Sequence, residues 1–317
     1  MSRISYDTAE TLVYDPVGAN RNATRSALYA LGFRRIETVA TLEAFNEFII
    51  RRPPDLAVCE AMGAEDRLCQ TIQSLRHGLN AYNPFIVIVV TAWENHHSLV
   101  NRVLDSGADD LLLRPYSTST LEARIRTHIE RRKGFVITSD YVGPDRRRDR
   151  SRPSNVDLFH PPNSLKMKVK ERLSAEEAAQ RIDTELKFAR ETLTAEKLRR
   201  DAFQICVLWR MIQERQPKGC KSERADLLKL GEYAKAVSRR SRDTEFEAAV
   251  EWCDALLSAL EGLELGVDRN ASMHLLGHAA LSLGQVFSPD KSVDENLAEI
   301  DATICRIKAR NKLSAAS

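Results

Sequence analysis

The stretch Pro54-Asp55-Leu56-Ala57-Val58-Cys59-Glu60 decides how the first part of the chain is interpreted. Residues 56–59 carry no charge, which is typical of a short strand buried on both faces. Glu60 stands where this strand ends. Because open parallel sheets hold their chemistry at the carboxyl ends of the strands, Glu60 is the first candidate for a functional residue.

Strand-like and helix-like stretches alternate on both sides of this strand. Further strands are predicted at residues 11–14, 36–39, 85–90 and 111–113, and helices at residues 20–31, 42–49, 67–76, 97–104 and 121–129. Five alternations in about 120 residues predict an α/β fold with one doubly wound, parallel, five-stranded sheet.

Four separated pieces of this region carry a family resemblance through their order and spacing. They are Pro54-Asp55-Leu56 before Glu60, Val90-Thr91-Ala92, Gly107-Ala108-Asp109-Asp110 and Arg114-Pro115. Residues 11–131 resemble the receiver domain of response regulators, which accepts a phosphoryl group on an aspartate in two-component signalling. The resemblance implies a flavodoxin-like strand order, 2-1-3-4-5. It also implies an output surface formed by residues 97–104, 111–113 and 121–129.

The chain departs from the family at the positions that carry the chemistry. Glu60 stands at the acceptor position, where the family has aspartate. Asp15 is followed by Pro16, although the family usually has two adjacent acids there to hold Mg²⁺. Arg114 replaces the family's lysine, and Leu111 replaces an aromatic residue that changes rotamer; Thr91 is unchanged.

These departures predict a pseudo-receiver without turnover. Phosphoryl transfer depends on a divalent ion and an aligned nucleophile, and proline offers no side-chain oxygen. The longer side chain of Glu60 moves its carboxylate roughly 1.5 Å past the in-line position. We therefore expect no enzymatic activity and no cofactor, Mg²⁺ included. We expect Glu60 to reach Thr91 and Arg114, with Arg114 holding it bidentately. In one interpretation the domain is then fixed near its activated shape. In the other, Glu60 is an ordinary solvated or ion-paired residue in a pocket that has lost its function.

The sequence predicts a receiver-like domain over residues 1–132, a basic, proline-containing linker over 133–170 and a helical effector domain over 171–317. The stretch 141–148 resembles a tail that follows receivers in some bacterial regulators. Its arginines, and those that follow it, could touch nucleic acid, although interspersed aspartates favour a solvated linker. The linker arginines are Arg146, Arg147, Arg148, Arg150 and Arg152.

The carboxy-terminal part has only helical periodicity. A seam of apolar residues over 174–215 predicts one helix of about 40 residues or two stacked ones, with coiled-coil character and a possible homodimer. Further helices are predicted at 225–237, 244–260, 271–283 and 292–307, which together favour a helical bundle. Capping boxes are predicted at Ser174 with Glu177, Thr244 with Glu247 and Ser292 with Glu295.

His274 is a candidate for phosphate transfer. The interval from His274 to Gly284 resembles that of histidine phosphotransfer bundles, but Gly277-His278 replaces the usual Lys-Gly pair. An ordinary helix histidine fits as well. DNA binding is the less favoured role, because the basic run 238–242 falls at a helix end, where cations favour the helix dipole.

The composition of the chain argues against several kinds of site and against a membrane segment. The chain has 317 residues, 43% hydrophobic and 29% charged, with a formal charge of +2, which is ordinary for a globular protein and gives no overall polyanion site. Six scattered cysteines without a CxxC pair argue against a disulfide framework and a zinc site. With no apolar segment long enough for a membrane, we expect a cytoplasmic location and no membrane partner.

The favoured function is a two-component (phosphorelay) signal-transduction regulator that acts by contact with other signalling proteins. The alternatives are an atypically phosphorylated response regulator, a DNA-binding transcriptional regulator and a degenerate histidine-phosphotransfer bundle at the carboxyl end.

Overall fold

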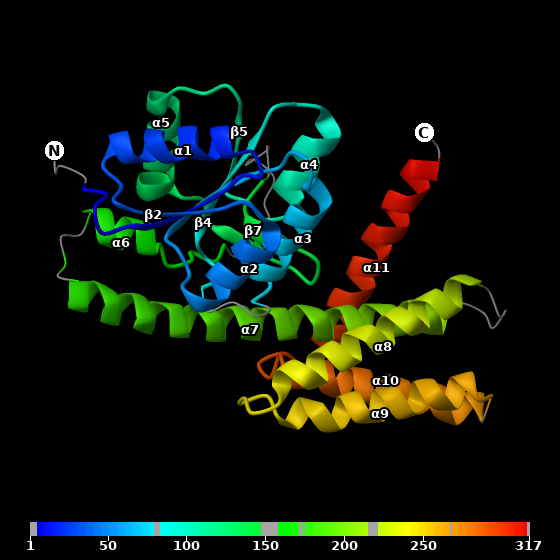
Figure 1. Ribbon diagram of the computed structural model, residues 1–317. Helices are drawn as coiled ribbons and strands as arrows, with labels where there is room; N and C mark the ends of the chain where they lie inside the picture. The colour runs from blue at the N-terminus through cyan, green and yellow to red at the C-terminus, as the bar shows by residue number, and fades with distance from the viewer. Residues whose placement is uncertain are drawn as a thin grey trace. The chain divides into compact units, whose positions relative to one another are not determined.

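The computed structural model describes residues 5–78, 83–146, 158–170, 173, 175–214, 221–266 and 268–315 (Figure 1). The chain forms two compact units, Met1–Leu193 and Thr194–Ser317, called here the sheet unit and the helical unit. The strands are β1 (Glu10–Tyr14), β2 (Arg35–Val39), β3 (Leu56–Glu60), β4 (Val87–Ala92), β5 (Asp110–Leu113), β6 (Phe135–Ile137) and β7 (Val142–Pro144). The helices of the sheet unit are α1 (Gly18–Leu31), α2 (Leu42–Arg51), α3 (Glu65–Arg76), α4 (His97–Asp105), α5 (Thr118–Arg131) and α6 (Ser164–Lys170).

The main sheet has five parallel strands in the order β2-β1-β3-β4-β5, as the sequence predicted. All five residues of β3 are buried, which agrees with the uncharged run that begins this strand. The register pairs Glu60 of β3 with Thr91 of β4. Because the strands are parallel, the residues at their carboxyl ends gather at one edge of the sheet.

Two apolar cores lie on the two faces of the sheet. One joins the sheet to α2, α3 and α4 through buried side chains such as Phe45, Leu68 and Leu99. The other joins it to α1, α5 and α6, where Leu28, Ile125 and Leu165 are fully buried. Figure 1 shows α1 and α5 together on one side of the strands.

The described part of residues 133–170 is folded, and is not an extended linker. Strands β6 and β7 form an antiparallel hairpin. Phe135 and Val142 of this hairpin are buried in a cluster with Phe85 and with Leu186 and Leu193 of the long helix α7. The sheet unit therefore extends to Leu193, beyond the boundaries expected at residues 132 and 170.

Helix α6 is the second anchor of this region. Its Leu165 and Val169 are buried in the core shared with α1 and α5. Lys168 Nζ donates to Asp55 Oδ2 at 2.8 Å, and Asn163 Nδ2, just before the helix, donates to the carbonyl of His128 at 2.8 Å. The segment is thus held to the sheet unit by polar as well as apolar contacts.

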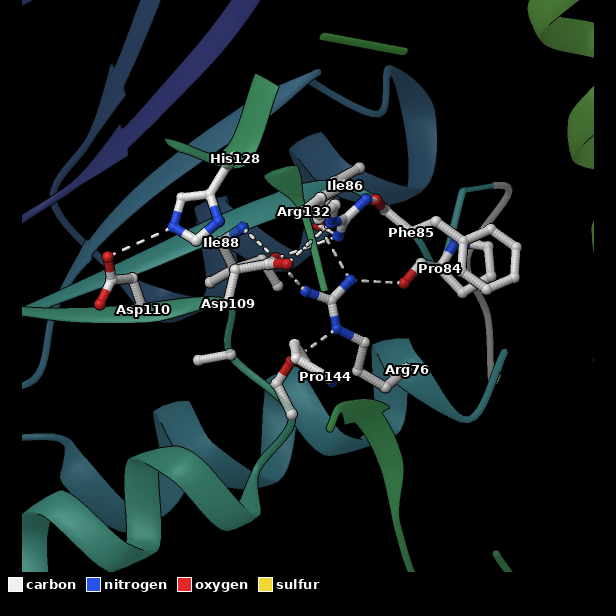
Figure 2. Close-up of polar contacts among 12 residues, drawn as sticks. Arg76, Pro84, Phe85, Ile86, Ile88, Asp109, Asp110, His128, Arg132 and Pro144 are labelled. Atoms are coloured by element: carbon white, nitrogen blue, oxygen red, sulfur yellow. Dashed lines mark hydrogen bonds and ion pairs between the residues drawn. The ribbon is translucent and has the colours of Figure 1, made fainter. Parts of the chain in front are cut away.

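A buried charge cluster, called here the Asp109 cluster, lies at the amino ends of β4 and β5 (Figure 2). Arg76 Nη2 donates to Asp109 Oδ2 at 2.8 Å, and Arg132 Nε donates to Asp109 Oδ1 at 2.8 Å. The side chains of Arg76 and Asp109 are 0% and 1% exposed. Both arginines also donate to backbone carbonyls, those of Pro84, Phe85, Ile86 and Gly107.

The hairpin reaches this cluster through backbone contact. Gly107 has a positive φ of 91°, and a Cβ there would lie 2.5 Å from the carbonyl oxygen of Val142. A Cβ on Gly143 would lie 2.7 Å from the Cα of Gly107. Arg146, expected as a solvated linker residue, donates to the carbonyls of Ala108 and Asp109. Arg147, Arg148, Arg150 and Arg152 lie outside the described residues.

The helical unit contains the second half of α7 (Ala175–Glu214), α8 (Lys221–Ser241), α9 (Ala248–Glu264), α10 (Arg269–Val286) and α11 (Val293–Ala315). Helix α7 is one helix of 40 residues. Its predicted apolar seam is buried within the chain: Leu186 and Leu193 lie in the core of the sheet unit, and Ile205 and Trp209 in that of the helical unit.

One of the predicted capping boxes is present and one is absent. Ser292 N donates to Glu295 Oε2 at 2.8 Å, and Glu295 N donates to Ser292 Oγ at 3.2 Å. Thr244 instead donates to the carbonyl of Ser241, and helix α9 begins only at Ala248. The predicted box at Ser174 falls outside the described residues. In the described parts of the chain, every helix is too short or too polar to cross a membrane.

Candidate functional site

Five polar residues with nearly enclosed side chains meet at the carboxyl edge of the sheet and form what is called here the Arg114 pocket. Asp15 follows β1, Glu60 ends β3, Thr91 lies near the end of β4, and Arg114 follows β5. The fifth residue, Thr24, lies on α1 and is 1% exposed. The structure therefore brings together the four residues that the sequence singled out in this domain.

Glu60 is fully enclosed, and both of its carboxylate oxygens accept hydrogen bonds. Its side chain is 0% exposed. Thr91 Oγ1 donates to Glu60 Oε2 at 2.7 Å, and Arg114 Nε donates to the same oxygen at 2.7 Å. The other oxygen, Oε1, accepts from the backbone N–H of Met62 at 3.1 Å. A longer acid at the acceptor position therefore occupies the two groups that the resemblance assigns to phosphoryl recognition.

Arg114 bridges two carboxylates instead of holding one bidentately. Its Nη2 donates to Asp15 Oδ2 at 3.0 Å and to Thr24 Oγ1 at 3.1 Å, while Nε is used for Glu60. The guanidinium carbon lies 5.1 Å from the centre of the Tyr116 ring and 6.0 Å from that of Trp93. These aromatic faces favour a cation at this position.

The surroundings of Asp15 disfavour its charged form. Burial raises the pKa of this carboxyl, and the nearby charge of Glu60 raises it further. The N–H of Val17, which donates to Asp15 Oδ1 at 2.8 Å, and the guanidinium of Arg114 act against this shift. The net direction is upward, as expected where one cation serves two buried carboxylates.

The arrangement does not fit the Mg²⁺ that the resemblance implies. Each carboxylate oxygen of Asp15 and Glu60 already accepts at least one hydrogen bond from the protein. Magnesium requires about six oxygen ligands in octahedral geometry, and Pro16 contributes no side-chain oxygen. The positive charge between the two acids is instead the guanidinium of Arg114. In the described residues, no group of three or more His, Cys, Asp or Glu side chains could hold a metal ion.

Thr24 and Tyr116 belong to the pocket although the sequence did not single them out. Their hydroxyl groups lie 2.8 Å apart, and Thr24 also accepts from Arg114. Thr24 had a usable signal, because it lies four residues before Leu28 on the buried stripe of α1. Tyr116 has no such signal, since its role depends on the direction in which the chain leaves β5.

His274 lies on α10 in the helical unit and is exposed. Gly277, three residues further on, packs against Trp209, whose indole Nε1 would lie 2.8 Å from an added Cβ. The ring of His278 contacts that of Trp252, with centroids 5.5 Å apart. Packing therefore accounts for Gly277, and the exposure of His274 by itself assigns it no role.

No family model and no curated protein matches the chain. The sheet unit is similar in structure to a signal receiver domain of two-component signal transduction (histidine kinase) from Clostridium thermocellum, at 17% identity and a TM-score of 0.35, over 39% of this chain and 98% of that one.

It is also similar to a two-component response regulator from Clostridium difficile, at 20% identity and a TM-score of 0.35, over 39% of this chain and 98% of that one. An orphan response regulator of H. pylori gives 20% identity and a TM-score of 0.32, over 38% and 95% of the two chains. The fold assignment itself rests on the strand order 2-1-3-4-5 and the parallel register.

Proposed function

We propose that this protein is a regulator of a two-component signalling pathway whose receiver-like domain does not turn over phosphate. It is not an enzyme, it needs no cofactor, and it acts by contact with other signalling proteins. The observation that carries the proposal is the contact of one Glu60 oxygen with both Thr91 and Arg114. The groups that would grip a phosphoryl oxygen already hold an internal carboxylate.

The electrostatics of the pocket support this proposal. An incoming phosphoryl group would bring further negative charge to a site where a single guanidinium already serves two carboxylates. Without a metal ion to offset that charge, the transfer loses its main source of stabilisation. The hydrogen-bonded carboxylate instead keeps the pocket in one arrangement, which suits recognition better than turnover.

The direct test is incubation of the full chain with Mg²⁺ and a small phosphodonor, followed by intact-mass and peptide mass spectrometry. We expect no added phosphoryl mass. A competent response regulator treated in parallel shows that the donor is active. A phosphoryl group on Glu60 or Asp15 would contradict the proposal and favour the atypically phosphorylated alternative.

A restored variant sharpens the test. The triple change Glu60→Asp, Pro16→Asp and Arg114→Lys returns the acceptor, the second acid and the lysine of the family pattern. We expect this variant to take up phosphate under conditions in which the native chain does not. The comparison separates a lost chemistry from a fold that could never support it.

Two further measurements address the alternatives. A mobility-shift assay with duplex DNA over a range of salt concentrations tests DNA binding, and we expect no retardation at physiological salt. His274→Ala tests the phosphotransfer alternative in a reconstituted relay, where we expect transfer between the other components to be unchanged. Loss of transfer with this variant would instead favour a role for the helical unit in carrying phosphate.

A further inference from the structure

The polar network around Glu60 continues toward one face of the sheet. From Glu60 it passes to Arg114, and from Arg114 Nη2 to Thr24 on α1. Thr24 is in turn hydrogen-bonded to the hydroxyl of Tyr116, which lies just before α5. Arg21 Nη1 adds a bond from α1 to the carbonyl of Asp15 at 2.7 Å. Helix α1 and the start of α5 are therefore tied directly to the pocket.

Toward the opposite face, the contacts described for the pocket reach loops and not helices: Glu60 Oε1 accepts from the N–H of Met62, and the guanidinium of Arg114 faces the ring of Trp93. Leu111, at the position of the family's switching aromatic, is apolar and packs against the core shared with α2, α3 and α4. The ion pairs of α4 run to α3, from Arg102 to Asp66 and Glu65. Among the described residues, no side-chain hydrogen bond or ion pair links α4 to the Arg114 pocket.

Helix α6 packs on the same face of the sheet as α1 and α5. Tyr116 packs against the core that contains Leu28 of α1, Leu121 of α5 and Leu165 of α6. Asn163 adds a hydrogen bond to the backbone of α5 at His128. Because packed cores shift between discrete arrangements rather than deform continuously, a movement of α1 and α5 would be passed to α6.

We propose that the state of the Arg114 pocket is read out on α1, α5 and α6, and not on α4. This inference rests on the proposed function, since it names the surface through which the regulator would respond. Loss of the bond between Glu60 and Arg114 would free the guanidinium and weaken its hold on Thr24. Helix α4 would keep all of its own contacts. This proposed surface shares α5 with the output surface that the resemblance implies, but has α1 and α6 in place of α4.

Hydrogen exchange followed by mass spectrometry on the full chain tests this route. In Glu60→Gln, we expect amides of α1, of the first turn of α5 and of α6 to exchange about tenfold faster, as a weakened charge-assisted bond predicts. Amides of α4 should change no more than those of α3, which report any loss of overall stability. Thr24→Val should reproduce the effect on α1 and α5 without changing β3 or β4. Tyr116→Phe, which keeps the ring, should give a smaller change in the same helices.

Two controls keep the result interpretable. Amides of α3 serve as the internal reference, because faster exchange there would report general unfolding. If Glu60→Gln fails to fold, Thr91→Val provides a second perturbation of the same carboxylate. Exchange that rises in α4 as much as in α1 and α5 would overturn the inference, as would unchanged exchange in α1 and α5.

Phosphodonor labelling separates this inference from the proposed function. Phosphoryl labelling of the native chain together with the expected exchange pattern would contradict the proposed function but would still support the readout on α1, α5 and α6. No labelling, together with faster exchange in α4, would contradict only the readout on α1, α5 and α6.

Discussion

The two edges of the same sheet carry opposite charge clusters. At the carboxyl edge, the guanidinium of Arg114 lies between the carboxylates of Asp15 and Glu60, so one positive and two negative charges leave an excess of negative charge. At the amino edge, the carboxylate of Asp109 lies between Arg76 and Arg132, and the excess is positive. All of these side chains are at most 8% exposed.

The backbone offsets each excess with dipoles of the matching sign. The carboxylates at the carboxyl edge accept from N–H groups of Val17 and Met62. The arginines at the amino edge donate to carbonyls that precede β4 and β5. The outcome nevertheless differs: the pKa of Asp15 is raised, while Arg132 and Arg76 overcome the effect of burial and lower the pKa of Asp109 to about 2. The charge of Asp109 is thus better matched by its surroundings than that of Asp15, so we expect substitutions at the amino edge to cost more stability.

The largest expected effect is that of Asp109→Asn. Removing this carboxylate leaves Arg76 and Arg132 buried without their counterion, which should cost about 3–5 kcal/mol in the free energy of unfolding. Urea denaturation measures the loss. Asp66→Asn, which breaks an exposed pair with Arg102, is the matched control and should cost less than about 1 kcal/mol. Equal losses in the two variants would mean that the Asp109 cluster is not a structural centre.

Gly107→Ala should have the next largest effect. The added Cβ would lie 2.5 Å from the Val142 carbonyl and 2.9 Å from Arg76 Cγ, so crowding adds to the strain of the left-handed backbone. We expect a loss of about 2–4 kcal/mol by urea denaturation. Gly63→Ala has a similar φ but nothing within 4 Å of the new Cβ, and should cost only about 1 kcal/mol. If both variants lose the same free energy of unfolding, the hairpin of β6 and β7 does not crowd the loop at Gly107.

The pH dependence of stability gives a third comparison. Because the folded-state pKa of Asp109 is about 2, below its ordinary value of 3.8, its contribution is fully present above about pH 4. It is lost as the pH falls from 4 toward 2, by an amount on the order of 2 kcal/mol. Thermal unfolding between pH 4 and pH 2 measures this contribution. In Asp109→Asn, the stability should depend less on pH over the same range. An unchanged slope in that variant would place the acid sensitivity elsewhere.

Glu60→Gln should have the smallest effect on overall stability. The amide keeps the shape of the side chain, and removing one of two neighbouring negative charges relieves part of the excess. We expect a loss of about 1 kcal/mol by urea denaturation, together with a lower pKa for Asp15, because the charge of Glu60 raises it. Glu43→Gln, in an exposed pair with Arg67, is the control. A loss as large as that of Asp109→Asn would contradict the difference between the two edges.

The sequence predicted the sheet well because its strands are short uncharged runs between helices with clear apolar spacing. Glu60, Thr91 and Arg114 could be brought together in advance, because parallel strands place their carboxyl ends at one edge. The bridging of Asp15 by Arg114 could not be predicted, since it depends on the direction of a long side chain.

The amino edge was not predicted, for a different reason. Arg76 and Arg132 end helices, where cations are ordinary, and nothing local indicates that Asp109 lies between them. Strand β7 has three residues, too few for a periodic pattern. Thr244 with Glu247 matched a capping box, yet the hydroxyl donates to Ser241 and the helix starts later. In each case a contact distant in sequence, or a competing local bond, decides the structure.

The 40-residue helix α7 has a consequence for any attempt to divide this protein. Its first half supplies Leu186, Ala189 and Leu193 to the core of the sheet unit. A fragment that starts at residue 171 would display these apolar side chains to solvent without Phe85 and Phe135 to cover them. Self-association of that fragment would result from the exposure of these side chains and would not show the native oligomeric state. Truncated variants should therefore keep residues up to 193 together with the sheet.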